Sequence, residues 1–178
     1  MGDSPFSERL ADAQELVYGP ILDWARRSVF QTNYLGHSVH PLLTDLTLGC
    51  WVSASLLDLA GGSQARRGAT LLVGVGLAAA VPTAIAGASD WAELKGDERR
   101  IGAVHGLGAD AAIFLFLGSL ISRKLGHYTL GTGLSLAGNA IVAGAGFLGG
   151  HLALNRGTAR RTTALAESEQ TQLPRPTS

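Results

Sequence analysis

Several side chains that could bind a ligand stand at the ends of long apolar runs in this chain. His40 begins the first run, Asp90 ends the second, His105 begins the third and His151 ends the fourth. Neutral imidazole is the commonest protein ligand for metal ions and also an axial ligand of haem iron. Ionisable groups are costly inside a membrane, so they usually face the interior of a helix bundle. These residues are therefore candidates for one shared site.

Three further ionisable residues extend the candidate site. His37 stands just outside the first run, and Asp45 and Asp110 stand about one helical turn deeper than the nearest histidine. Two chemistries fit the set. A haem b could be held by histidines from different helices, with the candidates His40, His105, His151 and His37. A metal ion could instead take imidazole and carboxylate ligands, with the candidates His40, His105, His151, Asp90, Asp45 and Asp110.

Arginines near the same end would suit a haem, because Arg pairs well with propionate carboxylates. The candidates are Arg26, Arg27, Arg99 and Arg100. A structural alternative stands beside this interpretation. The histidines would then bond to backbone or lipid headgroups, Asp45 and Asp110 would bond across helices, and Asp90 would pair with Arg99 or Arg100. In that case the polar cluster ties helices together and binds nothing.

The histidines also belong to a short internal repeat. His40 and Asp45 share the spacing His-x4-Asp with His105 and Asp110, and each pair opens an apolar run. The following run ends in a polar residue preceded by small residues, Asp90 in one half and His151 in the other. This pattern predicts a duplicated helical hairpin.

Long apolar segments must position these residues. They run over 41–60, 69–89, 104–121 and 129–154, and each approaches or exceeds the roughly 20 residues that cross a bilayer as a helix. We predict an all-α fold, an integral membrane four-helix bundle occupying residues 37–155. Alternating crossings would bring His40, Asp90, His105 and His151 to the same membrane face.

The flanking segments are different in character. Residues 1–36 predict an amphipathic, interfacial helical segment interrupted at Gly19-Pro20, with a soluble cap on the bundle as the alternative. Residues 156–178, rich in Thr, Ser, Gln and Pro, predict a disordered tail. No cleavable signal peptide is expected. Ten of the 14 Lys and Arg residues lie on the same side of the predicted membrane as the N-terminus. This excess predicts that both termini are cytoplasmic.

Composition excludes several function classes. Charged residues make up only 16 % of the chain and its formal net charge is zero, so nucleic acid is not an expected partner. Cys50 is the only cysteine, which excludes an intrachain disulfide and any cysteine-based cluster. We find no set of catalytic residues and expect no enzymatic activity. Glycine occurs 24 times, and the small-residue stripes could pack helices within one chain or in a homo-oligomer.

A set of ordered motifs resembles a known family over about residues 36–155. The motifs are Gly36-His37, His40-Pro41-Leu42-Leu43-Thr44-Asp45, Leu56-Leu57-Asp58, Gly87-Ala88-Ser89-Asp90-Trp91, Arg99-Arg100 with His105, and Gly149-Gly150-His151-Leu152. Together they resemble the bacterial membrane family called domain of unknown function 2231. Relatives often carry proline where this chain has Thr47 and an aromatic residue near Leu154.

The resemblance implies a four-span module of the bacterial cytoplasmic membrane, close to electron-transfer chemistry. Members of the family occur alone or joined to a Rieske-type ferredoxin domain. No Rieske ligands follow the fourth run here, so such a redox partner would be a separate chain. The leading hypothesis is a membrane anchor or electron-carrier module that binds haem b or a metal.

Two other hypotheses belong to different classes. One is a non-catalytic membrane scaffold or accessory subunit with a structural polar cluster. The other is a pathway for protons or small solutes, which the scarcity of ionisable residues in the opposite half of the bundle disfavours: Asp58 and Asn139 are the polar residues expected there.

Overall fold

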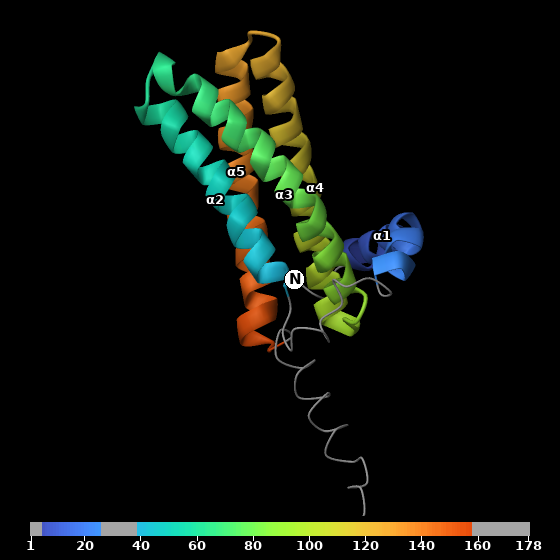
Figure 1. Cartoon of the computed structure of the whole chain (residues 1–178). Helices are drawn as coiled ribbons and strands as arrows, with labels where there is room; N and C mark the ends of the chain where they lie inside the picture. Colours follow the sequence, from blue (N-terminus) through green and yellow to red (C-terminus); the bar gives the residue numbers. More distant parts are fainter. Residues whose placement is uncertain (1–4, 26–38, 158–178) are drawn as a thin grey trace, which may run out of the picture.

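The computed structural model describes residues 5–25 and 39–157, and all secondary structure in these residues is helical (Figure 1). The predicted all-α fold is therefore confirmed. His37, Arg26, Arg27 and nearly all of the predicted tail lie outside the described residues.

Four long helices form the body of the molecule: α2 (His40–Ala60), α3 (Arg66–Trp91), α4 (Gly96–Lys124) and α5 (Tyr128–Gly150). A short 3-10 turn, Ser63–Ala65, precedes α3, and a π-helical turn, His151–Asn155, extends α5. Each of the four is long and apolar enough to cross a membrane. Glycines with positive φ (Gly62, Gly96 and Gly126) let the connectors reverse direction within a few residues.

α4 is longer than the predicted run 104–121 because charged turns continue it at both ends. Asp97 and Glu98 occupy its first turn, and Arg123 and Lys124 its last, where each charge complements the helix dipole. A prediction from hydropathy stops at the end of the apolar residues, although the helix continues through the charged turns. Arg123 therefore belongs to α4, although it lies beyond the end of the predicted run.

The helices alternate in direction and pack mainly as two hairpins, α2 with α3 and α4 with α5 (Figure 1). The beginnings of α2 and α4 and the ends of α3 and α5 therefore share one end of the bundle. This is the arrangement that the predicted duplication requires. We call it the histidine end, after His40 and His105.

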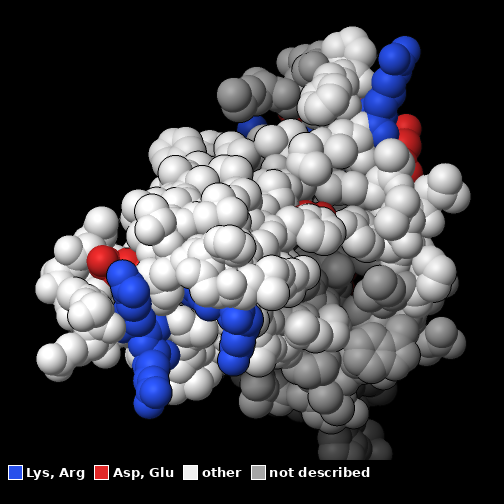
Figure 2. All heavy atoms as spheres, turned by 90° about the horizontal axis from the view of Figure 1, so that it is seen from above, with Lys and Arg blue, Asp and Glu red and all other residues white. Residues whose placement is uncertain are grey.

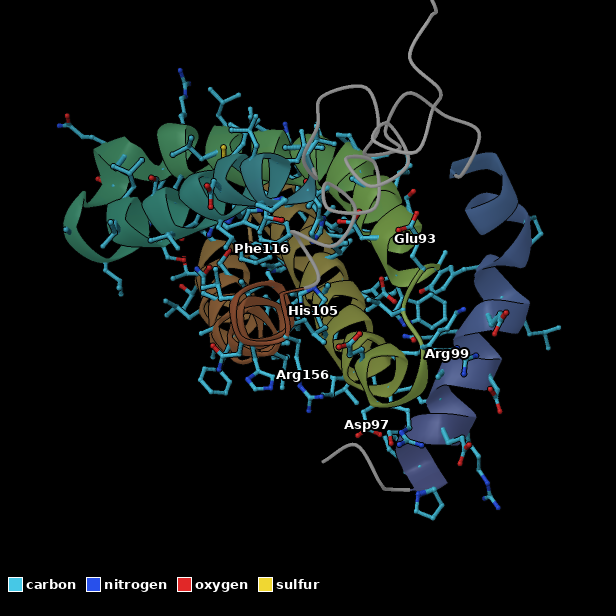
Figure 3. All side chains as sticks on the ribbon, turned by 90° about the horizontal axis from the view of Figure 1, so that it is seen from below. Glu93, Asp97, Arg99, His105, Phe116 and Arg156 are labelled. Atoms are coloured by element: carbon cyan, nitrogen blue, oxygen red, sulfur yellow. The ribbon has the colours of Figure 1, made fainter. Side chains whose placement is uncertain are left out.

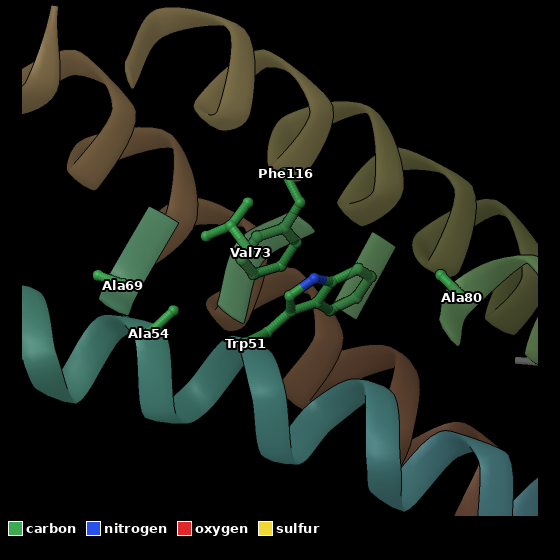
Figure 4. Close-up of a cluster of buried hydrophobic side chains, with 6 residues drawn as sticks. All are labelled: Trp51, Ala54, Ala69, Val73, Ala80 and Phe116. Carbon is green, nitrogen blue, oxygen red and sulfur yellow. The ribbon is translucent and has the colours of Figure 1, made fainter. Parts of the chain in front are cut away.

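An aromatic stack joins the hairpins near the centre of the bundle (Figure 4). Trp51 and Phe116 are stacked with ring centres 4.0 Å apart and planes 11° from parallel. Val73 and Phe116 are fully buried beside alanines of α2 and α3. Glycine allows this contact: a Cβ at Gly138 would lie 2.7 Å from Cε2 of Phe116, closer than real atoms approach. Trp51 is a packing residue.

The outer surface of the spans is apolar rather than polar. Phe114, Phe147 and Leu154 are 71 %, 76 % and 81 % exposed, and many aliphatic side chains resemble them. Seen from above, most of the described surface carries neither acidic nor basic groups (Figure 2). Contiguous apolar surface of this extent would be unfavourable in water but is what lipid chains contact.

A further helix, α1 (Pro5–Ala25), packs beside α4 and α3. It passes through Pro20 without ending, so the predicted interruption at Gly19-Pro20 is absent. Gln14 donates a hydrogen bond from Nε2 to the carbonyl of Ala103, at 3.2 Å.

Candidate cofactor site

The histidine end brings together one imidazole from each hairpin. The ring centres of His40 and His105 are 6.4 Å apart and their planes are almost perpendicular, at 89°. His40 is the first residue of α2, whereas His105 lies further along α4. Viewed from below, His105 lies near the middle of the bundle, between the two hairpins (Figure 3). The alternating topology thus produces the predicted meeting of these two residues.

Each imidazole is held in the same way by the second helix of its own hairpin. Nδ1 of His40 is 3.0 Å from the carbonyl oxygen of Thr83, and Nδ1 of His105 is 2.7 Å from that of Ala145. A carbonyl can only accept, so each Nδ1 carries the hydrogen. The neutral ring then carries its lone pair on Nε2, and this is the tautomer that binds a metal or haem iron through Nε2.

A glycine lies against each of these rings. A Cβ at Gly87 would be 2.8 Å from Cε1 of His40, and a Cβ at Gly149 would be 2.9 Å from Cε1 of His105. Both glycines follow the bonding carbonyl by four residues, Gly87 after Thr83 and Gly149 after Ala145. The predicted duplication is thus matched by atomic contacts that are alike in the two hairpins.

Both histidines line one cavity of about 980 Å³, which lies mainly between α3 and α4. Its lining is largely apolar from Leu77 to Ala88 on α3 and from Gly102 to Ile113 on α4, and the charged residues Glu93, Lys95 and Glu98 line it as well. Asp90 also lines it, within electrostatic range of the His40 imidazole. A mainly apolar cavity with a few convergent polar groups is typical of a small-molecule or cofactor site.

Other predicted ligands do not join this pair. His151 has its Nδ1 3.2 Å from Nδ2 of Asn155, on the same short helical turn, and it does not line the cavity. Asp45 is exposed on α2, and Asp110 accepts a 2.5 Å hydrogen bond from the hydroxyl of Tyr18. Of the three predicted imidazoles, those of His40 and His105 therefore meet, and that of His151 lies apart from the cavity.

A metal ion held by several of these residues is not supported by their arrangement. Within residues 5–25 and 39–157, no three His, Cys, Asp or Glu side chains gather closely enough to hold one. The predicted metal set of His40, His105, His151, Asp90, Asp45 and Asp110 is thus spread along the helices. The His-x4-Asp spacing is one reason why these ligands are not gathered. Five residues turn a helix by about 140°, so the His and Asp of one pair project in different directions.

The arginines expected near the site have other partners. Nη1 of Arg99 is 3.1 Å from Oδ1 of Asp12, and its Nη2 is 2.5 Å from Oε2 of Glu15, both on α1. Arg100 pairs with Asp97 one turn earlier in α4. Arg99 therefore joins α1 to the bundle, and neither arginine is placed to meet propionates in this arrangement.

At the opposite end of the spans the structure contains an ion pair that the sequence did not predict. Arg123 and Asp58 have side chains with no solvent exposure, and their charged groups are in contact. Nη1 of Arg123 donates to Oδ1 of Asp58 at 2.9 Å, and the hydroxyl of Tyr128 donates to the same oxygen at 2.6 Å. We call this cluster of Asp58, Arg123 and Tyr128 the ion-pair end.

Two serines complete the ion-pair end. Nε of Arg123 donates to Oγ of Ser119 at 3.0 Å, and Nη2 donates to Oγ of Ser135 at 3.2 Å. Arg123 also lies over the ring of Tyr128, 4.6 Å from its centre. Because α2, α4 and α5 all contribute, the cluster fastens the two hairpins together. The signal that could have found it was an Asp and an Arg near the same membrane end of the first and third spans.

The family assignment agrees with this arrangement. The family described as Predicted membrane protein (DUF2231) matches residues 36–162, which is most of the chain and includes all four spans. The chain belongs to that family of membrane proteins, as its motifs suggested. It matches no curated protein and no solved structure.

Proposed function

We propose that this membrane protein binds haem b between His40 and His105 and serves as an electron-carrier module or anchor of a redox system. The separation of the two rings carries the proposal. His40 and His105 come from different hairpins and lie close enough together that both could bind one haem iron. The observed separation is 6.4 Å.

The residues around the pair would prepare it for such a ligand. The Thr83 and Ala145 carbonyls hold each ring by Nδ1–H, which orients Nε2 and makes it a better donor to iron. The small residues of α3 and α4 leave room for a flat group, and the apolar lining limits water. Bound haem would supply reversible one-electron chemistry, whose potential depends on its axial ligands and surroundings.

Absorption spectroscopy of the protein, produced with ample haem and purified in mild detergent, tests this proposal. We expect a Soret band that shifts on reduction. His40→Ala and His105→Ala should each abolish or displace it, whereas His151→Ala and His127→Ala should leave it unchanged. Equal monodispersity and helix content would show that each variant is folded. A colourless wild-type protein, or bands indifferent to both substitutions, would refute haem binding at this pair.

A scaffold function is the second candidate, and a specific observation favours it. Each Nδ1 bond already joins the two helices of its hairpin, which is a sufficient structural reason for both histidines. A scaffold would be colourless, and His40→Ala would lower its stability by about 1 kcal/mol through the lost hydrogen bond. The proton pathway has less support, because the acid at the opposite end is bound by Arg123.

The setting of the module is part of the proposal. We place it in the bacterial cytoplasmic membrane with both termini in the cytoplasm, and with a separate Rieske-type or other redox protein as partner. The excess of Lys and Arg on the N-terminal side supports this orientation. A reporter fused after Ser178 that is active only outside the cytoplasm tests it. Activity of that reporter would show that the C-terminus lies outside the cytoplasm and would contradict the proposed orientation.

A further inference from the structure

α1 presents three faces of different chemistry. Successive residues of a helix are about 100° apart, so Ser7, Ala11, Gln14 and Tyr18 share one face. Ser7 and Ala11 are 3 % and 0 % exposed. Gln14 and Tyr18 bond to α4, and both line the cavity. This face, which is polar or small throughout, therefore lies against the bundle.

A second face carries the charges. Glu8, Asp12 and Glu15 follow one another at intervals of four and three residues, and all three are exposed. Two of them bind Arg99 in the first turn of α4. In the view from below, Arg99 lies beside α1 at the edge of the bundle (Figure 3). Charged groups of this kind remain in contact with water or headgroups.

The third face is mainly apolar, although it includes the exposed Arg9, and it points away from the bundle. Phe6 and Val17, eleven residues apart, project in nearly the same direction, and Leu16 and Ala13 widen the stripe. Phe6, Leu16 and Val17 are 65 %, 84 % and 69 % exposed. A soluble cap would turn its apolar residues inward and its polar residues outward. In α1 the face toward the bundle is instead more polar than the face that points away from it.

The position of the α1 contacts along α4 agrees with α1 turning its apolar face away from the bundle. α4 spans 29 residues, or about 43 Å, against a hydrocarbon core of about 30 Å. Asp110, which accepts the Tyr18 bond, lies about 21 Å along α4 from Gly96, near its middle. The second half of α1 thus lies against a part of α4 that is inside the bilayer.

We infer that α1 is embedded in the lipid leaflet, with Phe6, Leu16 and Val17 in contact with acyl chains. The two spans that α1 packs against also expose apolar side chains, among them Val81 of α3 and Phe114 of α4, which are 61 % and 71 % exposed. The charged row faces the membrane surface. Since Gln14 and Tyr18 line the cavity, α1 separates the histidine pair from lipid rather than from water.

Site-directed fluorescence in vesicles tests this inference. Single cysteines replace Val17 and, as a matched control on the same helix, Glu8, and each is labelled with a bimane. Cys50 is buried and stays in place, and protein without an added cysteine provides the background. The vesicles contain phosphatidylcholine and phosphatidylglycerol, with or without brominated acyl chains, and iodide serves as the aqueous quencher.

We expect brominated lipid to quench the label in Val17→Cys and iodide to quench the label in Glu8→Cys. A membrane-impermeant maleimide should also react about tenfold more slowly with Val17→Cys than with Glu8→Cys. Equal iodide quenching and equal reaction rates at the two positions, with no effect of brominated lipid, would overturn the inference. The helix would then be a water-exposed cap.

Discussion

The two ends of the bundle use buried polar groups in opposite ways. At the ion-pair end, Arg123 bonds to Asp58, Ser119 and Ser135, so its guanidinium nitrogens are all satisfied within the protein. At the histidine end, the Nδ1 atoms of His40 and His105 are bonded to backbone carbonyls, and both rings line a cavity. Polar groups that are saturated within the protein stabilise a fold, whereas polar groups that line a mainly apolar cavity can bind a ligand.

The largest expected effect comes from breaking the ion-pair end. Asp58→Ala leaves the Arg123 charge buried without its counter-charge, which costs about 3–5 kcal/mol of stability. Thermal unfolding in detergent, followed by circular dichroism, measures this loss. Arg67→Ala removes an exposed charge near the same end and serves as the control, with a small expected effect.

Asp58→Ala also tests whether the ion-pair end and the histidine end have separate roles. If the two ends have separate roles, the folded fraction of Asp58→Ala retains any haem band of the wild type. Loss of the band in protein that is still folded would mean that the ion-pair end also shapes the histidine site. An unchanged melting temperature would show that the pair contributes no stability.

A smaller effect is expected from filling the space beneath the imidazoles. Gly149→Ala places a methyl group against His105 and should turn the ring, which we expect to weaken haem binding; overpacking of this kind also costs about 1–3 kcal/mol of folding stability. Gly150→Ala, where the added methyl meets nothing within 4 Å, is the matched control. Haem titration of protein produced without haem measures both.

The duplication makes the same prediction for the first hairpin. Gly87→Ala should act on His40 as Gly149→Ala acts on His105, and Gly74→Ala, in open space on the same helix, is its control. A loss of affinity in one hairpin only would contradict the symmetric role of the two imidazoles.

The smallest effect concerns α1 and pH. Burial of the Tyr18 hydroxyl, then its hydrogen bond to Asp110 and the charge of that carboxylate, raise the pKa of Tyr18 to about 12 from an ordinary 10.0. The docked helix holds this proton more tightly than the undocked one. The stabilisation is therefore complete below pH 10 and is lost as the pH rises from 10 through about 12.

Absorbance at 295 nm measures this titration. The difference between the wild type and Tyr18→Phe should contain one phenol that ionises near pH 12. A difference centred near pH 10 would show that α1 does not hold Tyr18 against Asp110.

Hydropathy and alternation were sufficient to predict the four spans and the meeting of His40 with His105. Rotation about each helix axis was not predictable, because apolar residues cover most of every span and do not define one inward face. That is why His151 and Asp45 were expected at the site and lie elsewhere. The ion-pair end was missed because the predicted third run ends at 121, before Arg123, whereas α4 continues to Lys124.

The contacts of Gly87 and Gly149 show what an internal repeat can and cannot reveal. The His-x4-Asp spacing indicated the duplication, yet the aspartates have unrelated environments in the two hairpins. What the hairpins share is an imidazole, a carbonyl and a glycine four residues later. Backbone carbonyls leave no mark in a sequence, so this part of the repeat required coordinates.

Low-temperature electron paramagnetic resonance of the oxidised, haem-loaded protein tests the central claim most directly. Two imidazoles on one ferric iron give a low-spin signal, and nearly perpendicular rings make that signal highly anisotropic. With planes at 89°, we predict such a signal from one centre per chain, and its absence in His105→Ala. A wild-type protein without a ferric haem signal, or a signal that persists in His105→Ala, would contradict the account.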